Sequence, residues 1–196
     1  MSDGAADRIL KASLVLFARH GFPRTSMADI ARETGIARAT LYLYFPDKRA
    51  VFEALAASLV DDALASAKAA WRDDAALAKN LESVVLAKDL GFFRLMNATP
   101  HGSELLAVDT DLTRRHAERL DADFTAFLTR RAGEIRKQGF PLNAFGGAKG
   151  FGAFLTTASA GLKHEARTEP DYRRAVRQLA RVASAAALGS SKGEAR

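Results

Sequence analysis

A chain of 196 residues with 48% hydrophobic content can bury a sizeable core, as one domain or as a small domain joined to a larger one. It has no cysteine, which excludes disulfides and thiolate metal sites. The lack of cysteine also makes a reducing cytoplasm the expected compartment, and the polar start and the absence of a long uncharged apolar run predict no secretory signal and no membrane span. The net charge of +6 favours a polyanionic partner.

The first predicted helix runs from Asp7 to His20. Ile9, Leu16 and Phe17 fall on one face of this helix, as the inward stripe of an amphipathic helix should. Gly21 follows at the position where glycine commonly ends a helix. We expect this helix to support the segment that comes next.

Two short helices joined by a tight turn are predicted between Thr25 and Lys48. Ser26 can accept a hydrogen bond from a free N–H group at the start of the first helix, and Gly35 can close it in the left-handed conformation. The second helix spans Arg38 to about Phe45, and Pro46 stops it. This arrangement describes a helix-turn-helix reader of the DNA major groove, although an αα corner in an unrelated helical protein would share it.

The outer face of the second helix supplies the candidate DNA contacts. Arg38 stands at the N-terminal end, which contacts base edges in this motif, and it can reach either a guanine or a phosphate. Ala39 or Thr40 can touch a thymine methyl group, whereas Tyr42 and Tyr44 suit phosphates. The alternative for Arg38 is a solvated surface side chain.

The residues from Ile9 to Leu55 resemble the DNA-binding domain of TetR-type bacterial regulators. The resemblance rests on the segments F-A-R-H-G-F, T-S-M-A-D-I-A, T-G-I-A-R-A-T-L-Y-L-Y-F and D-K-R-A-V-F, and it covers about a quarter of the chain. It implies that Lys48 contacts the DNA backbone. We also place Thr25, Ser26 and Met27, at the start of the motif, among the DNA contacts.

An all-α fold follows from this resemblance and from the helical periodicity downstream. We expect an N-terminal three-helix helix-turn-helix domain (1–50), a connecting helix (about 47–68) and a larger C-terminal helical bundle for ligand binding and dimerisation (51–188), about nine helices in all. A disordered tail is expected at 189–196. The downstream helices are predicted at about 73–98, 103–110, 113–138, 143–165 and 171–188.

Aromatic side chains are frequent in the C-terminal part, where a bundle core is their default interpretation. In TetR-type proteins, however, the corresponding helices surround a cavity for a small inducer. An aromatic wall with few charges here would suit an apolar or aromatic inducer. The residues that we assign to this wall are Phe93, Met96, Asn97, His101, Phe124, Phe127, Leu128, Phe151, Phe154 and Thr157.

The last two predicted helices contain many glycines and alanines. Glycine weakens an isolated helix by about 1 kcal/mol relative to alanine, so these small side chains indicate close packing. The packing can lie within one chain. The TetR resemblance instead implies a four-helix interface with a second subunit, and such a homodimer would bind a two-fold operator.

No catalytic set is recognisable in the sequence. The four histidines are scattered without metal-ligand spacing, and there is no nucleophile elbow, P-loop or dinucleotide fingerprint. We therefore expect no enzyme, cofactor or metal site, and interpret the chain as a dimeric repressor released from its operator by an inducer. Two alternatives remain: the same fold regulated by a protein partner, and an enzyme with an unrecognised site in the bundle.

Overall fold

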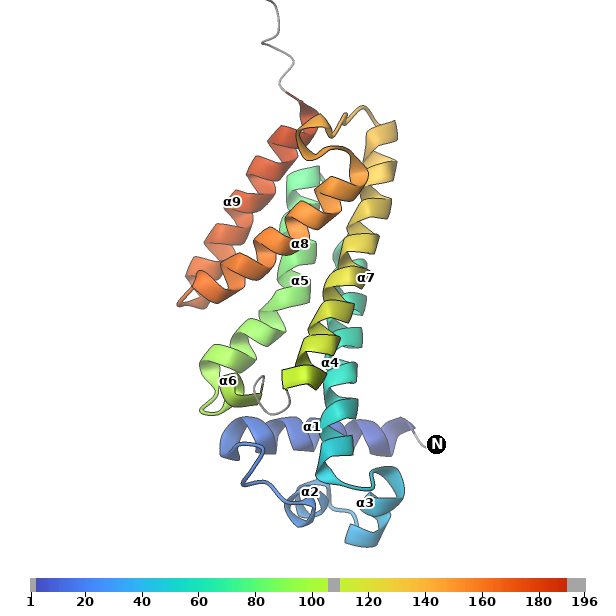
Figure 1. Cartoon of the computed structure of the whole chain (residues 1–196), viewed down its shortest axis with the longest axis vertical. Coiled ribbons are helices and arrows are strands. Elements are labelled where there is room, and N and C mark those ends of the chain that lie inside the picture. Colours follow the sequence, from blue (N-terminus) through green and yellow to red (C-terminus); the bar gives the residue numbers. More distant parts are fainter. Residues whose placement is uncertain (1–2, 106–109, 190–196) are drawn as a thin grey trace, which may run out of the picture. The chain divides into compact units, whose positions relative to one another are not determined.

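A computed structural model describes residues 3–105 and 110–189. All regular structure in these residues is helical, which confirms the all-α prediction (Figure 1). The helices are α1 (Asp3–His20), α2 (Met27–Thr34), α3 (Arg38–Tyr44), α4 (Lys48–Ala70), α5 (Leu77–Ala98), α6 (Gly102–Leu105), α7 (Thr110–Lys137), η1 (Asn143–Phe145, a 3-10 helix), α8 (Ala148–Glu165) and α9 (Glu169–Leu188). Apart from residue 189, the predicted disordered tail lies outside the described residues. No described helix combines the length and apolarity that a membrane span requires.

The chain divides into two compact units. Unit 1 comprises Met1–Asp62 and Phe92–Ala117, and unit 2 comprises Ala63–Gly91 and Glu118–Arg196. The boundary falls within α4, α5 and α7, so each of these helices contributes residues to both units. Unit 1 contains the whole predicted helix-turn-helix segment.

The core of unit 1 forms where α1, α2 and α3 meet the start of α4. Ile9, Ile30 and Leu41 are completely buried in it, as their spacing predicts. Leu105 and Leu112 belong to the same cluster, although they come from a segment far along the sequence. The core of unit 1 is therefore completed by residues from beyond α5.

Helix α2 begins and ends as the sequence predicts. The Ser26 hydroxyl oxygen accepts from the Asp29 N–H at 3.2 Å, and the Asp29 carboxylate accepts from the Ser26 N–H at 2.9 Å. These reciprocal bonds form a capping box. At the other end Gly35 adopts φ 68°, a left-handed conformation that favours glycine, and the chain turns there into α3.

Two predicted helices start later than expected. Residues 71–76 form a connection because Asn80 binds its backbone: the Asn80 amide accepts from the Arg72 N–H at 2.8 Å and donates to the Arg72 carbonyl at 2.7 Å. The predicted helix 143–165 is interrupted after η1, because Gly146 and Gly147 both adopt positive φ. In both cases the run of apolar and small residues led us to predict a helix that is longer than the observed one.

Helix α3 begins without a side-chain cap. Ala37 has extended backbone angles (φ −63°, ψ 143°), and no side chain bonds the free N–H groups at the start of the helix. Ala37→Ser should supply that acceptor, raise the free energy of unfolding by about 0.5–2 kcal/mol and raise the Tm. Thermal unfolding followed by circular dichroism checks this, with the exposed Ala39→Ser as a control inside the helix. An unchanged or lower Tm for Ala37→Ser would contradict it.

Unit 2 buries a cluster of charges in its core. Lys88 and Asp89 on α5 have side chains only 1% and 0% exposed, and their charged groups lie 2.9 Å apart. The Asp89 carboxylate also accepts from the Lys163 ammonium on α8 at 3.2 Å and from the Tyr172 hydroxyl on α9 at 3.1 Å. One carboxylate thus connects α5, α8 and α9.

Candidate functional site

The outer face of α3 is the candidate DNA interface. Leu41 is completely buried, whereas Arg38, Ala39, Thr40, and the two tyrosines are exposed. Leu41 anchors the helix to the core of unit 1, so its opposite face is presented to solvent. The structure therefore places all five predicted reader residues of α3 on the surface.

Arg38 and Tyr42 contact each other one turn apart. An Arg38 guanidinium nitrogen donates to the Tyr42 hydroxyl at 3.3 Å, and the guanidinium carbon lies 5.6 Å from the centre of the Tyr42 ring. This bond uses only one of the five guanidinium N–H groups. The arginine fork is therefore oriented by Tyr42 and keeps donors for a base edge or a phosphate.

Leu43 is the residue of this face that sequence reasoning missed. Its side chain is 86% exposed. Two residues along an α-helix differ by about 200° in direction, so Ala39 and Leu43, each two positions from Leu41, point directly away from the core. The centre of the exposed face is therefore apolar, and the helical wheel around Leu41 would have revealed it.

The other predicted contacts at the start of the motif are arranged differently. Thr25 and Met27 have buried side chains, and the Thr25 hydroxyl donates to the Gly21 carbonyl at 2.9 Å. Ser26 is exposed, but its hydroxyl belongs to the capping box of α2. Any DNA contact from Thr25 or Met27 in this conformation would use backbone atoms.

Lys48 at the start of α4 binds the connection between α1 and α2. Its ammonium group donates to the carbonyls of Phe22 at 2.6 Å and Thr25 at 2.8 Å, and it lies 4.3 Å from the centre of the Phe22 ring. Burial lowers the pKa of this lysine. The third N–H of the ammonium faces the Pro23 carbonyl at 3.4 Å, so the phosphate contact that we predict for Lys48 would replace one of these three carbonyl contacts.

The predicted ligand-wall residues fall in both units. Phe93, Met96, Asn97 and His101 belong to unit 1, and the other six belong to unit 2. Within unit 2, the α7 members Phe124, Phe127 and Leu128 and the α8 member Phe151 are buried, whereas Phe154 is 43% exposed and Thr157 is exposed.

Helices α8 and α9 pack against each other within unit 2 (Figure 1). Gly152 is needed for packing within the chain, because an added Cβ atom would lie 2.8 Å from the Thr125 carbonyl oxygen of α7. On the outer side, Phe154 of α8 and Val182 of α9, the latter 58% exposed, leave apolar surface in solvent. Packing within the chain therefore explains the small residue Gly152, but it does not explain the exposed apolar side chains of these two helices.

Comparisons with known proteins agree with this geometry. Residues 9–55 match the family described as bacterial regulatory proteins, tetR family. An HTH-type transcriptional regulator of Mycobacterium tuberculosis is 33% identical over 87 residues, which are 43% of this chain and 46% of that protein. The chain thus matches less than half the length of this curated relative.

Solved structures extend the likeness to the fold of the chain. A transcriptional regulator from Cytophaga hutchinsonii has a TM-score of 0.71 at 22% identity, covering 95% of this chain and 97% of that one. The SmeT–triclosan complex has a TM-score of 0.65 at 18% identity, covering 99% and 100%. The family match itself covers residues 9–55, where this chain is similar to the tetR family of bacterial regulatory proteins.

Proposed function

We propose that this protein is a DNA-binding transcriptional regulator, acting as a repressor that leaves a two-fold operator when a small molecule binds. The observation that carries the proposal is the exposed face of α3, where Arg38, Tyr42 and Leu43 lie opposite the buried Leu41. The capped helix α2 and the left-handed turn at Gly35 hold this face on the core of unit 1.

Binding to labelled duplex DNA, followed by fluorescence anisotropy at several salt concentrations, tests the proposal. The logarithm of the association constant should fall linearly with the logarithm of the salt concentration, because bound phosphates release counterions. Arg38→Ala should weaken binding, while Arg8→Ala, an exposed change on α1, should leave it unchanged. Equal affinities for both variants and the wild type would contradict the assignment of α3 as the reader.

Leu43 should contribute to sequence specificity through an apolar contact. A buried methyl-sized group is worth about 0.8 kcal/mol, so replacing the contacted thymine by deoxyuridine should weaken wild-type binding by about threefold to fivefold. Leu43→Ala should bind both operators with similar affinity, and its stability should match the wild type because the side chain is exposed. The contact does not exist if every thymine-to-uracil change weakens DNA binding by the wild type no more than it weakens binding by Leu43→Ala.

The homodimer is proposed to form through the outer faces of α8 and α9. Phe154 and Val182 offer exposed apolar surface there, and a two-fold interface would bury both residues from each subunit. Two reader helices related by the same axis would then meet a two-fold operator.

An apolar or aromatic inducer is proposed to act on the C-terminal part, with the six predicted wall residues of unit 2 as its candidate contacts. Support comes from the aromatic side chains of unit 2, where the rings of Phe124 and Phe127 lie 6.2 Å apart and Trp71 lies against Phe127. SmeT, which shares this fold, is solved with triclosan. Triclosan can therefore serve as a first probe in a thermal-shift screen of aromatic compounds. A screen without any stabilising compound would favour the alternative of a protein partner.

A further inference from the structure

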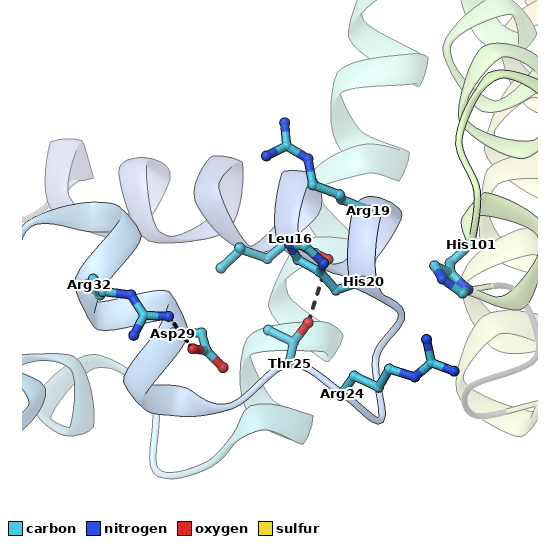
Figure 2. A pocket seen from close by; sticks show the side chains of 8 residues that line it. All are labelled: Leu16, Arg19, His20, Arg24, Thr25, Asp29, Arg32 and His101. Atoms are coloured by element: carbon cyan, nitrogen blue, oxygen red, sulfur yellow. Dashed lines mark hydrogen bonds and ion pairs between the residues drawn. The ribbon is translucent and has the colours of Figure 1, made fainter.

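A pocket of about 360 Å³ lies in unit 1, and no residue of α3 lines it. Its wall is formed by the end of α1, the α1–α2 connection, helix α2 and the turn before α6 (Figure 2). The charged and titratable residues of this wall are Arg19, His20, Arg24, Asp29, Arg32 and His101. Its volume falls within the range of small-molecule sites.

The pocket carries an excess of positive charge. Among the described residues that line it, Asp29 is the only carboxylate, and it is already bonded to the Ser26 N–H, the Ser26 hydroxyl and the Arg32 guanidinium. The bonds from Ser26, reinforced by Arg32, hold the pKa of Asp29 below its usual value, so this group stays ionised and occupied. It therefore leaves Arg19 and Arg24 without a neutralising partner.

Arg19 and Arg24 are exposed, and within the described ranges neither makes a side-chain hydrogen bond or ion pair. Figure 2 shows Arg24 extending toward the side of the pocket on which His101 lies. Arginine presents a planar fork of donors that matches phosphate oxygens. Both side chains can therefore turn toward an anion without breaking a contact that holds the fold.

The end of α1 does not need these arginines as caps. The Phe17 carbonyl accepts from the Gly21 N–H at 2.9 Å, and the Ala18 carbonyl accepts from the His101 N–H at 3.1 Å. The second bond also fixes the turn that carries His101 against α1. The two walls of the pocket, from distant parts of the sequence, are thus joined by the backbone.

We propose that this pocket binds a small phosphate-bearing anion. Arg19 and Arg24 would pair with its oxygens, and His101 would contact it from the opposite wall. Because the ligand would touch both α2 and the turn before α6, its binding can change DNA affinity only if it favours one arrangement of these elements over another. Binding of the anion itself does not depend on the proposed DNA-binding function.

Calorimetric titration of the full chain with inorganic pyrophosphate at constant ionic strength tests this inference. We expect saturable binding at one site per chain, weakened about tenfold or more in Arg19→Gln/Arg24→Gln. Arg8→Gln/Lys11→Gln removes the same number of positive charges from exposed positions of α1 outside the pocket and should bind as the wild type does. Circular dichroism verifies that both variants are folded.

Three results would overturn the proposal. In the first, titration of the wild type with pyrophosphate gives no saturable heat. In the second, all three proteins bind pyrophosphate with equal affinity, because the attraction is nonspecific. In the third, no protein binds pyrophosphate but the double variant alone loses affinity for duplex DNA, which would assign the arginines to backbone phosphates of DNA.

Discussion

Asp89→Asn should lower the free energy of unfolding by about 3–5 kcal/mol, the usual cost of leaving a buried charge without its partner. The substitution removes the carboxylate that lies 2.9 Å from the Lys88 ammonium and 3.2 Å from that of Lys163. The next carboxylate, Asp121, lies 4.0 Å from Lys88 and is 48% exposed. Urea denaturation at neutral pH measures the loss.

Glu82→Gln provides the control for this change. Glu82 pairs with Arg177 at 3.1 Å across unit 2; the Glu82 side chain is 14% exposed, but that of Arg177 is 54% exposed, so solvent screens the pair on its arginine side. A pair open to solvent contributes about 0–1 kcal/mol, so this variant should be nearly as stable as the wild type. A similar loss for both variants would show that the Asp89 cluster has no special role.

The stabilising effect of Asp89 should also depend on pH. Burial by itself raises the pKa of this carboxyl, but Lys88 and then Lys163 more than offset it, so the pKa lies below its usual value. A depressed folded-state pKa means that the stability is present above the unfolded pKa of about 4 and is lost as the pH falls through the folded value. The difference in free energy of unfolding between the wild type and Asp89→Asn should therefore become smaller as the pH falls. A difference that stays the same at every pH would contradict the charge-based explanation.

Val182→Arg should convert the proposed dimer into monomers. Val182 is 58% exposed in the single chain, so an arginine there should leave the fold of one subunit intact. In a two-fold interface, however, it would bury unpaired positive charge, and the dimer dissociation constant should rise by about 100-fold or more. Sedimentation at a series of protein concentrations measures the change.

Ala65→Arg is the matched control, because it adds the same charge at an exposed position of α4. It should dimerise as the wild type does. The monomeric Val182→Arg should also lose most of its operator affinity, because one reader helix would contact only one half-site. A Val182→Arg protein that remains dimeric would place the interface elsewhere.

Local patterns were sufficient to predict the two short helices and the turn between Thr25 and Lys48. The cap at Ser26, the turn at Gly35 and the burial of Leu41 depend on neighbouring residues, and the structure has all three. Leu105 and Leu112 could not be assigned to the same core, because only the tertiary fold brings them to α1.

The buried charged pair and the charged pocket also could not be predicted from local sequence patterns. The Lys88–Asp89 pair is adjacent in the sequence and looks like a solvated surface, yet both side chains are buried by helices from distant segments. The pocket beside Arg24 likewise depends on the turn carrying His101, which the sequence does not place near α1. In both cases the site is created by contacts between distant segments rather than by a motif.

Selection from a random duplex DNA library at near-physiological salt is the most direct test of the regulator assignment. The wild type and Arg8→Ala should enrich the same two-fold motif, with half-sites about one helical turn or more apart. Arg38→Ala/Tyr42→Ala should enrich none, because it removes both members of the oriented pair on α3. Enrichment of the same motif by the double variant, or of no motif by the wild type, would contradict the account.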